Sequence, residues 1–121
     1  MGHSSKTSAF DINIFMDTQT ERLTIIGDKI KMESILVNLI QNALKYGDSS
    51  ERIKMMVEVL NEYIKVSIGN KIDHQKQIQS GNKLGLWICG QLAEKQGFKF
   101  SWSSSDVHFN TQLDIPISAH N

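Results

Sequence analysis

The fold is decided by residues 28–47, which read DKIKMESILVNLIQNALKYG. Between Lys29 and Tyr46 the apolar side chains recur at three- and four-residue spacing, the period that places them along one side of an α-helix. Asp28 stands at the N-cap position and Gly47 at the C-cap position. The apolar stripe comprises Ile35, Leu36, Leu39, Ile40, Ala43 and Leu44. The segment therefore predicts an amphipathic helix over residues 29–46 that packs its apolar side against a core.

A second helix is predicted in the C-terminal part of the chain. Leu84, Ile88 and Leu92 are four residues apart, so they would line one helix face. The pattern stops near Gln96 and is followed by Gly97, a residue typical of helix C-termini. We expect this face to pack on the same core as the first helix.

The rest of the chain alternates with the period of two that is typical of β-strands. Five such runs cover residues 10–14, 53–59, 64–68, 98–102 and 107–115. The short polar turn at Asn61 and Glu62 joins the second run to the third, which indicates a hairpin. Helices layered on one face of such strands predict an α+β protein, a two-layer α/β sandwich with a mixed, mostly antiparallel sheet.

One common core is expected for these elements. We expect it to bury Ile35, Leu39, Ile40, Val57, Val66, Leu84, Ile88 and Leu113 together. Trp87, Trp102 and the phenylalanines are also interpreted as core residues rather than as ligand contacts. Residues 69–83 (GNKIDHQKQIQSGNK) fit neither period and predict a loop, and loops of this length are usually functional or mobile.

Composition and charge limit the classes of function. The chain has 121 residues, of which 40% are hydrophobic and 21% charged, as expected of one ordinary globular domain. Thirteen basic residues balance thirteen acidic ones, so nothing favours contact with nucleic acid or a membrane surface, and any anion site must be local. The single Cys89 fits a reducing cytoplasm. We expect residues 1–5 to be a start or tag remnant, residues 6–118 the domain and residues 119–121 a tail, without signal peptide or membrane span.

Polar residues of the first predicted helix form one half of a candidate site. Asn38, Asn42 and Lys45 are four and three residues apart and share one face, opposite the apolar stripe. A solvated face is the simpler interpretation, but asparagine is a poor helix former, so two of them indicate a role. The other half is residues 81–86 (GNKLGL), which open the second helix. A glycine-rich helix N-terminus favours phosphate, because its free N–H groups and its dipole attract anions.

With these motifs in view, the sequence resembles a known family. Residues 26–47 resemble the N box of histidine kinases in the GHKL superfamily, including its Asn-Ala-x-Lys-Tyr run. Residues 81–97 resemble the G2 box with its helix, and residues 109–117 (FNTQLDIPI) resemble the terminal strand. The resemblance covers about residues 10–117 and implies the Bergerat fold of an ATP-binding catalytic domain, here shortened and partly degenerate.

The resemblance assigns ATP contacts to the first helix. Asn42 matches the asparagine whose side-chain carbonyl binds the Mg²⁺ that bridges the ATP phosphates, and hard cations prefer such oxygen ligands. Lys45 matches a phosphate-contacting base, and Tyr46 matches a residue beside the nucleotide, with plain core packing as its alternative. Asn38 stands where ATP-hydrolysing relatives carry a water-activating glutamate. An amide cannot act as that base, so no catalytic residue is assigned and kinase chemistry is favoured over hydrolysis.

The G2 box and the terminal strand supply further contacts by the same resemblance. The residues assigned to the nucleotide there are Gly81, Lys83, Leu84, Gly85, Leu86 and Thr111. Lys83 stands in place of the middle glycine of the box. Its side chain would either crowd the phosphates or, being cationic, contact them, and the sequence leaves both alternatives open.

The G1 box departs from the family pattern Asp-x-Gly-x-Gly. Asn70 takes the place of the aspartate that accepts a hydrogen bond from the adenine amino group, and its carbonyl could accept that bond without charge assistance. The two glycines that follow in the family are absent, and Ile72 is included in the nucleotide site. About eight residues separate Ile72 from Gly81, so the ATP lid would be very short.

The histidines do not supply a phospho-accepting segment. They are His3, His74, His108 and His120. None is followed by Glu-x-x-Thr or Asp-x-x-Thr, so all four are interpreted as surface residues.

The resemblance implies the ATP-binding catalytic domain of a cytoplasmic two-component sensor kinase, whose parent protein is either free or membrane-anchored. It would bind Mg-ATP and pass the γ-phosphate to a histidine on a separate dimerisation domain, and from there to a response regulator. The altered G1 box and short lid keep a pseudokinase alternative open, in which the domain binds a response regulator or kinase helix with weak or no nucleotide affinity. A serine kinase of the anti-sigma type is disfavoured by Asn38.

Overall fold

The computed structural model describes residues 8–16, 19–77 and 82–118. Its elements in chain order are β1 (Ala9–Met16), β2 (Gln19–Ile26), α1 (Lys29–Tyr46), β3 (Lys54–Val59), β4 (Tyr63–Lys71), α2 (His74–Gln77), α3 (Asn82–Lys95), β5 (Lys99–Ser104) and β6 (His108–Pro116). Within these ranges no helix is long and apolar enough to cross a membrane.

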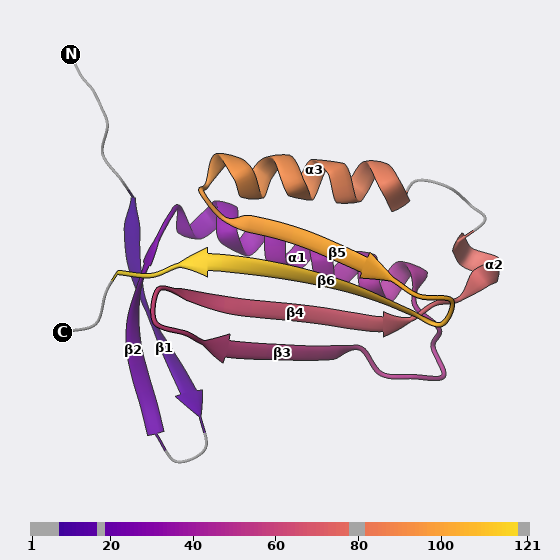
Figure 1. Ribbon diagram of the computed structural model, residues 1–121, viewed down its shortest axis with the longest axis horizontal. Helices are drawn as coiled ribbons and strands as arrows, with labels where there is room; N and C mark the ends of the chain where they lie inside the picture. The colour runs from indigo at the N-terminus through magenta and orange to yellow at the C-terminus, as the bar shows by residue number, and fades with distance from the viewer. Residues whose placement is uncertain (1–7, 17–18, 78–81, 119–121) are drawn as a thin grey trace.

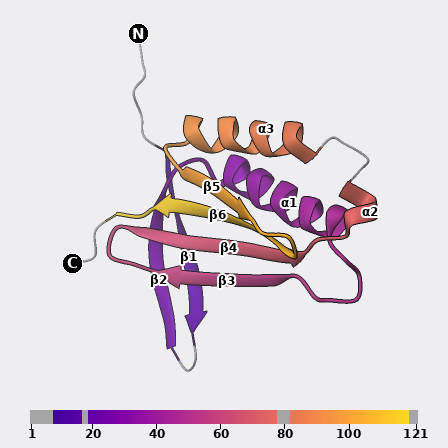
Figure 2. The same ribbon diagram turned by 45° about the vertical axis from the view of Figure 1, so that its right-hand side comes forward.

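The elements form two layers. A four-stranded sheet of order β3-β4-β6-β5 carries α1 and α3 on one face, and its other face has no helix (Figures 1 and 2). The β1–β2 hairpin forms a separate two-stranded sheet, joined to the end of the larger sheet by a bridge between Ile25 and Ile117. The predicted two-layer sandwich is confirmed. Every pairing between these strands is antiparallel, and the hairpin stands outside the single sheet that the sequence predicted.

Helix α1 begins after Asp28 and ends before Gly47, the two residues that the sequence predicted as its caps. The Asp28 carboxylate accepts a hydrogen bond of 3.0 Å from the Lys31 N–H, and the Gly47 N–H donates to the Ala43 carbonyl at 2.9 Å. The backbone of Gly47 is extended, with φ of −79°, so this cap does not use the left-handed freedom of glycine. Glycine is needed for a close approach instead, because an added Cβ would lie 2.5 Å from the Ala43 carbonyl oxygen. Gly97, which follows α3, does adopt a left-handed φ of 77°.

The core lies between the helices and the covered face of the sheet. Its largest fully buried side chains are Ile25, Ile35, Leu113 and Ile115. Of the predicted core residues, Ile35, Leu39, Val66 and Leu113 are buried and Ile40 is partly buried against them. The side chain of Leu84 lies outside the described part of the structure. The alternation of the strands and the stripe of α1 therefore placed most of the core correctly.

The prediction that Val57 and Ile88 are buried in the core is wrong, because their exposed fractions are 45% and 42%. Val57 faces the helix side, but β3 is an edge strand, and α1 and α3 pack chiefly over β4 and β5 (Figure 2). Helix α3 buries Leu86, Cys89 and Ala93. Ile88 lies about 200° round the helix from Leu86, so its side chain points away from the core.

The interpretation of both tryptophans as core residues is also wrong. Trp87 on α3 is 63% exposed and Trp102 on β5 is 54% exposed. Trp87 lies at an open groove that is also lined by Trp102 of β5. Trp102 lies on the sheet's edge strand β5, where α3 covers its side chain only in part. Among the phenylalanines, Phe98 is buried as predicted, whereas the prediction is wrong for Phe15, which is 69% exposed.

Two further segments differ from their predicted structure. Strand β2 was not predicted, although its buried Leu23 and Ile25 alternate with partly exposed neighbours. The predicted loop over residues 69–83 is shorter in the structure, because β4 continues to Lys71 and a short helix, α2, follows.

Candidate functional site

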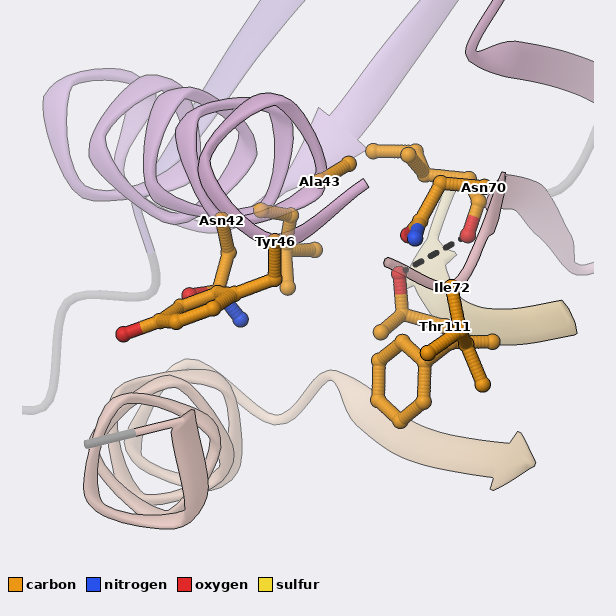
Figure 3. A pocket seen from close by; sticks show the side chains of 9 residues that line it. Asn42, Ala43, Tyr46, Asn70, Ile72 and Thr111 are labelled. Carbon is orange, nitrogen blue, oxygen red and sulfur yellow. Dashed lines mark hydrogen bonds between the residues drawn. The ribbon is translucent and has the colours of Figure 1, made fainter. Parts of the chain in front are cut away.

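A narrow pocket lies between the C-terminal half of α1 and the ends of β4 and β6 (Figure 3). Its lining comprises Leu39, Asn42, Ala43, Tyr46, Ile68, Asn70, Ile72, Phe109 and Thr111. Register explains the strand side, because Ile68 pairs with Thr111 and Asn70 pairs with Phe109 on the face that carries the helices. The pocket therefore brings predicted residues of α1, of the strand before the lid and of the terminal strand into one place.

Asn42 connects this pocket to the start of α3. Its side chain is half-buried on the fourth turn of α1, with Tyr46 one turn further along (Figure 3). A Cβ added at Gly85 would lie 3.8 Å from the Asn42 Oδ1 atom, so α3 passes close to this amide. The two halves of the predicted phosphate site therefore lie side by side, since α1 and α3 also pack together.

On the strand side, two buried polar residues face the pocket. Asn70 is 8% exposed, and its Nδ2 donates to the Lys71 carbonyl at 3.1 Å. Among the described residues no donor to the Asn70 Oδ1 is found, so this oxygen keeps its acceptor capacity. Thr111 is 4% exposed and its hydroxyl donates to the Ile68 carbonyl at 3.3 Å. These side chains give one wall of an otherwise apolar pocket its polar character.

The pocket has little room. Its volume is about 10 Å³, enough for about one water molecule, whereas ligand pockets usually measure roughly 300–1,000 Å³. Ile72 is 7% exposed and stands two residues after Asn70, where the family pattern has its first glycine. Its backbone is fixed by a bridge to Gly47 and by donation to the Val107 carbonyl at 2.7 Å. A planar base can enter only if Ile72 or another lining side chain moves.

Some predicted residues do not line this pocket. Asn38 is exposed, and Lys45 is exposed with its Nζ 5.3 Å from the centre of the Tyr46 ring. Leu86 is buried on α3. Gly81 and the side chains of Lys83 and Leu84 lie outside the described residues. Of the polar residues Asn38, Asn42 and Lys45 on α1, only Asn42 therefore lines the pocket.

Phe109 is a lining residue that the sequence reading did not assign to the site. Its ring lies 5.6 Å from that of Trp102, with the planes tilted by 33°. The strand alternation carried the signal, because Phe109 is two residues before Thr111 and so shares its face. Together these rings place an aromatic pair at the strand side of the pocket.

The oxygen ligands for a cation are few. In the described ranges, no three His, Cys, Asp or Glu side chains gather to hold a metal ion. The Asn42 carbonyl could supply one ligand, and the remaining ligands would be phosphate oxygens and water, as is common for Mg²⁺.

The groups with shifted pKa values lie elsewhere. A hydrogen bond from the Thr24 hydroxyl and the neighbouring Arg22 guanidinium lower the pKa of Asp11 on the β1–β2 hairpin. Burial raises the pKa of the Cys89 thiol on α3, which keeps this cysteine in its unreactive thiol form. Neither residue lines the pocket.

Known proteins are similar to this chain in sequence and in fold. No family model matches the chain. The adaptive-response sensory kinase SasA of Prochlorococcus marinus subsp. pastoris is 28% identical over 115 residues, which cover 79% of this chain and 31% of SasA. SasA of Prochlorococcus marinus strain MIT 9303 is 26% identical over 132 residues, covering 92% of this chain and 35% of the relative. The chain thus spans about a third of the length of these curated relatives.

Solved structures give the same result at the level of the fold. The catalytic domain of the histidine kinase ThkA superposes with a TM-score of 0.61 at 26% identity, covering 78% of this chain and 71% of that domain. The Acinetobacter baumannii histidine kinase AdeS superposes with a TM-score of 0.64 at 16% identity, covering 83% of this chain and 51% of AdeS, which supports the fold alone. By sequence the chain is therefore similar to SasA histidine kinases, and by fold to the catalytic domains of histidine kinases.

Proposed function

We propose that this chain binds Mg-ATP in the pocket between α1, β4 and β6, as the catalytic domain of a two-component sensor kinase. The observation that carries the proposal is the convergence of three separate motifs. Asn42 from α1 lines the pocket whose strand wall holds Asn70, and the same Asn42 lies beside Gly85 at the start of α3. Convergence of motifs from three elements is unexpected for residues that only solvate the surface.

Each residue has a chemical role in this proposal. The Asn42 carbonyl would ligate Mg²⁺, which when bound neutralises phosphate charge. The Asn70 Oδ1 would accept a hydrogen bond from the adenine amino group. Gly85 lets the phosphates approach the backbone of α3, and Lys45 would leave the Tyr46 ring to contact them. Phosphoryl transfer depends mainly on such positioning and charge neutralisation, so no protein nucleophile is required.

The partners follow from the incomplete coverage of the relatives. Because the chain matches about a third of SasA, the accepting histidine would belong to a separate dimerisation domain, with a response regulator as the next acceptor. We propose a cytoplasmic location for this domain, in line with its single buried cysteine.

A second candidate function is favoured by one observation, the closure of the pocket by Ile72. A branched side chain where the family has glycine leaves about 10 Å³, and the lid that would cover a nucleotide is short. In this alternative the domain is a pseudokinase that keeps the fold to bind a kinase helix or response regulator, with weak or no nucleotide affinity.

A calorimetric titration with a non-hydrolysable ATP analogue and Mg²⁺ separates the two candidates. Under the first, the wild type binds and Asn42→Ala lowers the affinity roughly ten- to a hundredfold, since it removes a contact to a charged group. Gln41→Ala is the matched control, because Gln41 is the adjacent amide on α1 and is exposed outside the pocket. Absence of wild-type binding at millimolar nucleotide would support the pseudokinase. Equal binding by Asn42→Ala and the wild type would place the site elsewhere.

A second variant tests the adenine contact. Asn70→Ala removes the proposed acceptor, so discrimination between ATP and GTP should fall while the dependence on Mg²⁺ remains. Unchanged discrimination would remove Asn70 from the proposed base contact.

A further inference from the structure

A second hollow lies on the face of the large sheet that has no helix. Its volume is about 220 Å³. Lys54, Gly69 and Asn110 stand opposite one another on β3, β4 and β6, and they form one row across its floor. Gly69 keeps the floor open, because an added Cβ would lie 3.1 Å from the Asn110 Oδ1 atom. The absence of a side chain at Gly69 therefore leaves room at the floor of the hollow.

Basic side chains surround this hollow. Arg52, Lys54 and His108 line it together with one acidic residue, Glu51. The His108 Nε2 lies 3.4 Å from the Glu51 carboxylate. Arg52 and Lys54 carry two positive charges against the one negative charge of Glu51, which leaves a local excess of one in a chain whose net charge is zero. This local excess favours a small anion.

Neighbouring charges do not cancel this excess. Lys71, which stands opposite His108 in the register, lies 4.0 Å from the Asp48 carboxylate, so these two charges balance each other. Met56 and the backbone around Phe109 add apolar surface to the lining. The hollow thus combines cations with an apolar patch, which suits an anion attached to a small organic group.

We propose that this hollow binds a small organic phosphate, held by Arg52, Lys54 and an imidazole N–H of His108. A phosphomonoester carries a charge of about −1.5 to −2 near neutral pH, so the two cationic side chains attract it. Arg52 can present its fork of N–H donors to two phosphate oxygens.

This site is distinct from the proposed nucleotide site. Lys54, Gly69 and Asn110 of the hollow lie on the face of the sheet away from α1 and α3, whereas the pocket beside Asn42 lies between α1 and the opposite face. Only Asn70 and Phe109 contribute to both linings, so the β4–β6 pair is the wall between them. The proposal therefore stands whether or not the chain binds ATP.

The test follows the His108 imidazole by NMR during titration of the full chain with phenyl phosphate and, separately, with inorganic phosphate. A His108→Gln variant assigns its signal. We expect saturable shifts of the His108 signal and tighter binding of phenyl phosphate than of inorganic phosphate. Arg52→Ala and Lys54→Ala should each weaken binding about three- to tenfold.

Lys99→Ala is the matched control, because Lys99 lies on the same face opposite Asp114, roughly 13 Å along β6 from Asn110. It should bind like the wild type, and Asn42→Ala should also bind like the wild type. Absence of saturation at millimolar phosphate, or an equal loss in Lys99→Ala and Arg52→Ala, would overturn the proposal. A signal that Asn42→Ala abolishes would mean that the phosphate binds in the other pocket, and would overturn it too.

Discussion

Replacement of Ile72 by alanine tests whether this side chain closes the pocket. In the structure Ile72 is 7% exposed and its pocket holds about 10 Å³. To admit a base, the side chain would have to move into water, which costs about 1.5–3 kcal/mol for a buried isoleucine. Ile72→Ala removes that cost from the binding equilibrium, so nucleotide affinity should rise roughly ten- to a hundredfold.

The same substitution should lower the stability of the fold. Truncation of a buried isoleucine to alanine costs about 2–5 kcal/mol, and the position of Ile72 at a pocket favours the lower end. The free energy of unfolding of most domains is about 5–15 kcal/mol, so the variant should remain folded. Chemical denaturation measures this loss, and calorimetry with Mg²⁺ and a non-hydrolysable ATP analogue measures the affinity.

Ile117→Ala is the matched control for this experiment. Ile117 is 4% exposed and lies at the bridge to β2, outside the pocket lining. The Ile117→Ala variant should lose about as much stability as Ile72→Ala, without any gain in nucleotide affinity. If Ile72→Ala loses stability like the control but binds nucleotide no better than the wild type, Ile72 is not the obstacle and the reasoning fails.

Three other predictions follow from the structure. Gly47→Ala should destabilise the chain by about 1–3 kcal/mol in chemical denaturation, because its Cβ would lie 2.5 Å from the Ala43 carbonyl oxygen; an unchanged midpoint would contradict this. The lowered pKa of Asp11 means that its bonds to Thr24 and Arg22 stabilise the fold above the usual carboxyl value of 3.8 and are lost as the pH falls below it. The stabilities of Asp11→Asn and the wild type should therefore differ at neutral pH and converge in acid. Finally, the isolated chain should neither label itself with γ-labelled ATP nor hydrolyse it, and acid-labile label on a histidine would refute this.

The sequence predicted the elements whose signals are local. Helix α1 has the predicted bounds because Asp28 and Gly47 mark its two ends and the apolar spacing between them is regular. The β3–β4 hairpin was also predicted, from alternation on both sides of a polar turn. Asn42, Asn70 and Thr111 were assigned by resemblance, and the structure places all three around one pocket.

The sequence could not predict features that depend on what covers a side chain. In α3 two apolar stripes compete, and only packing on the sheet selects the one through Leu86 and Ala93 over the one through Ile88. Val57 alternates correctly but lies on a strand that the helices leave open. The narrowness of the pocket depends on Ile72 being fixed against Gly47, a contact between residues 25 positions apart. Periodicity carries no information about such long-range contacts.

The exposure of both tryptophans decides which spectroscopic signal can follow this domain. Trp87 and Trp102 are 63% and 54% exposed, so their indole rings already contact water in the folded state. Unfolding would change their surroundings only modestly, which makes intrinsic fluorescence a weak reporter of denaturation, and circular dichroism a better one. The two rings line a common groove between α3 and β5. A blue shift of their emission would therefore report that another molecule has covered this groove.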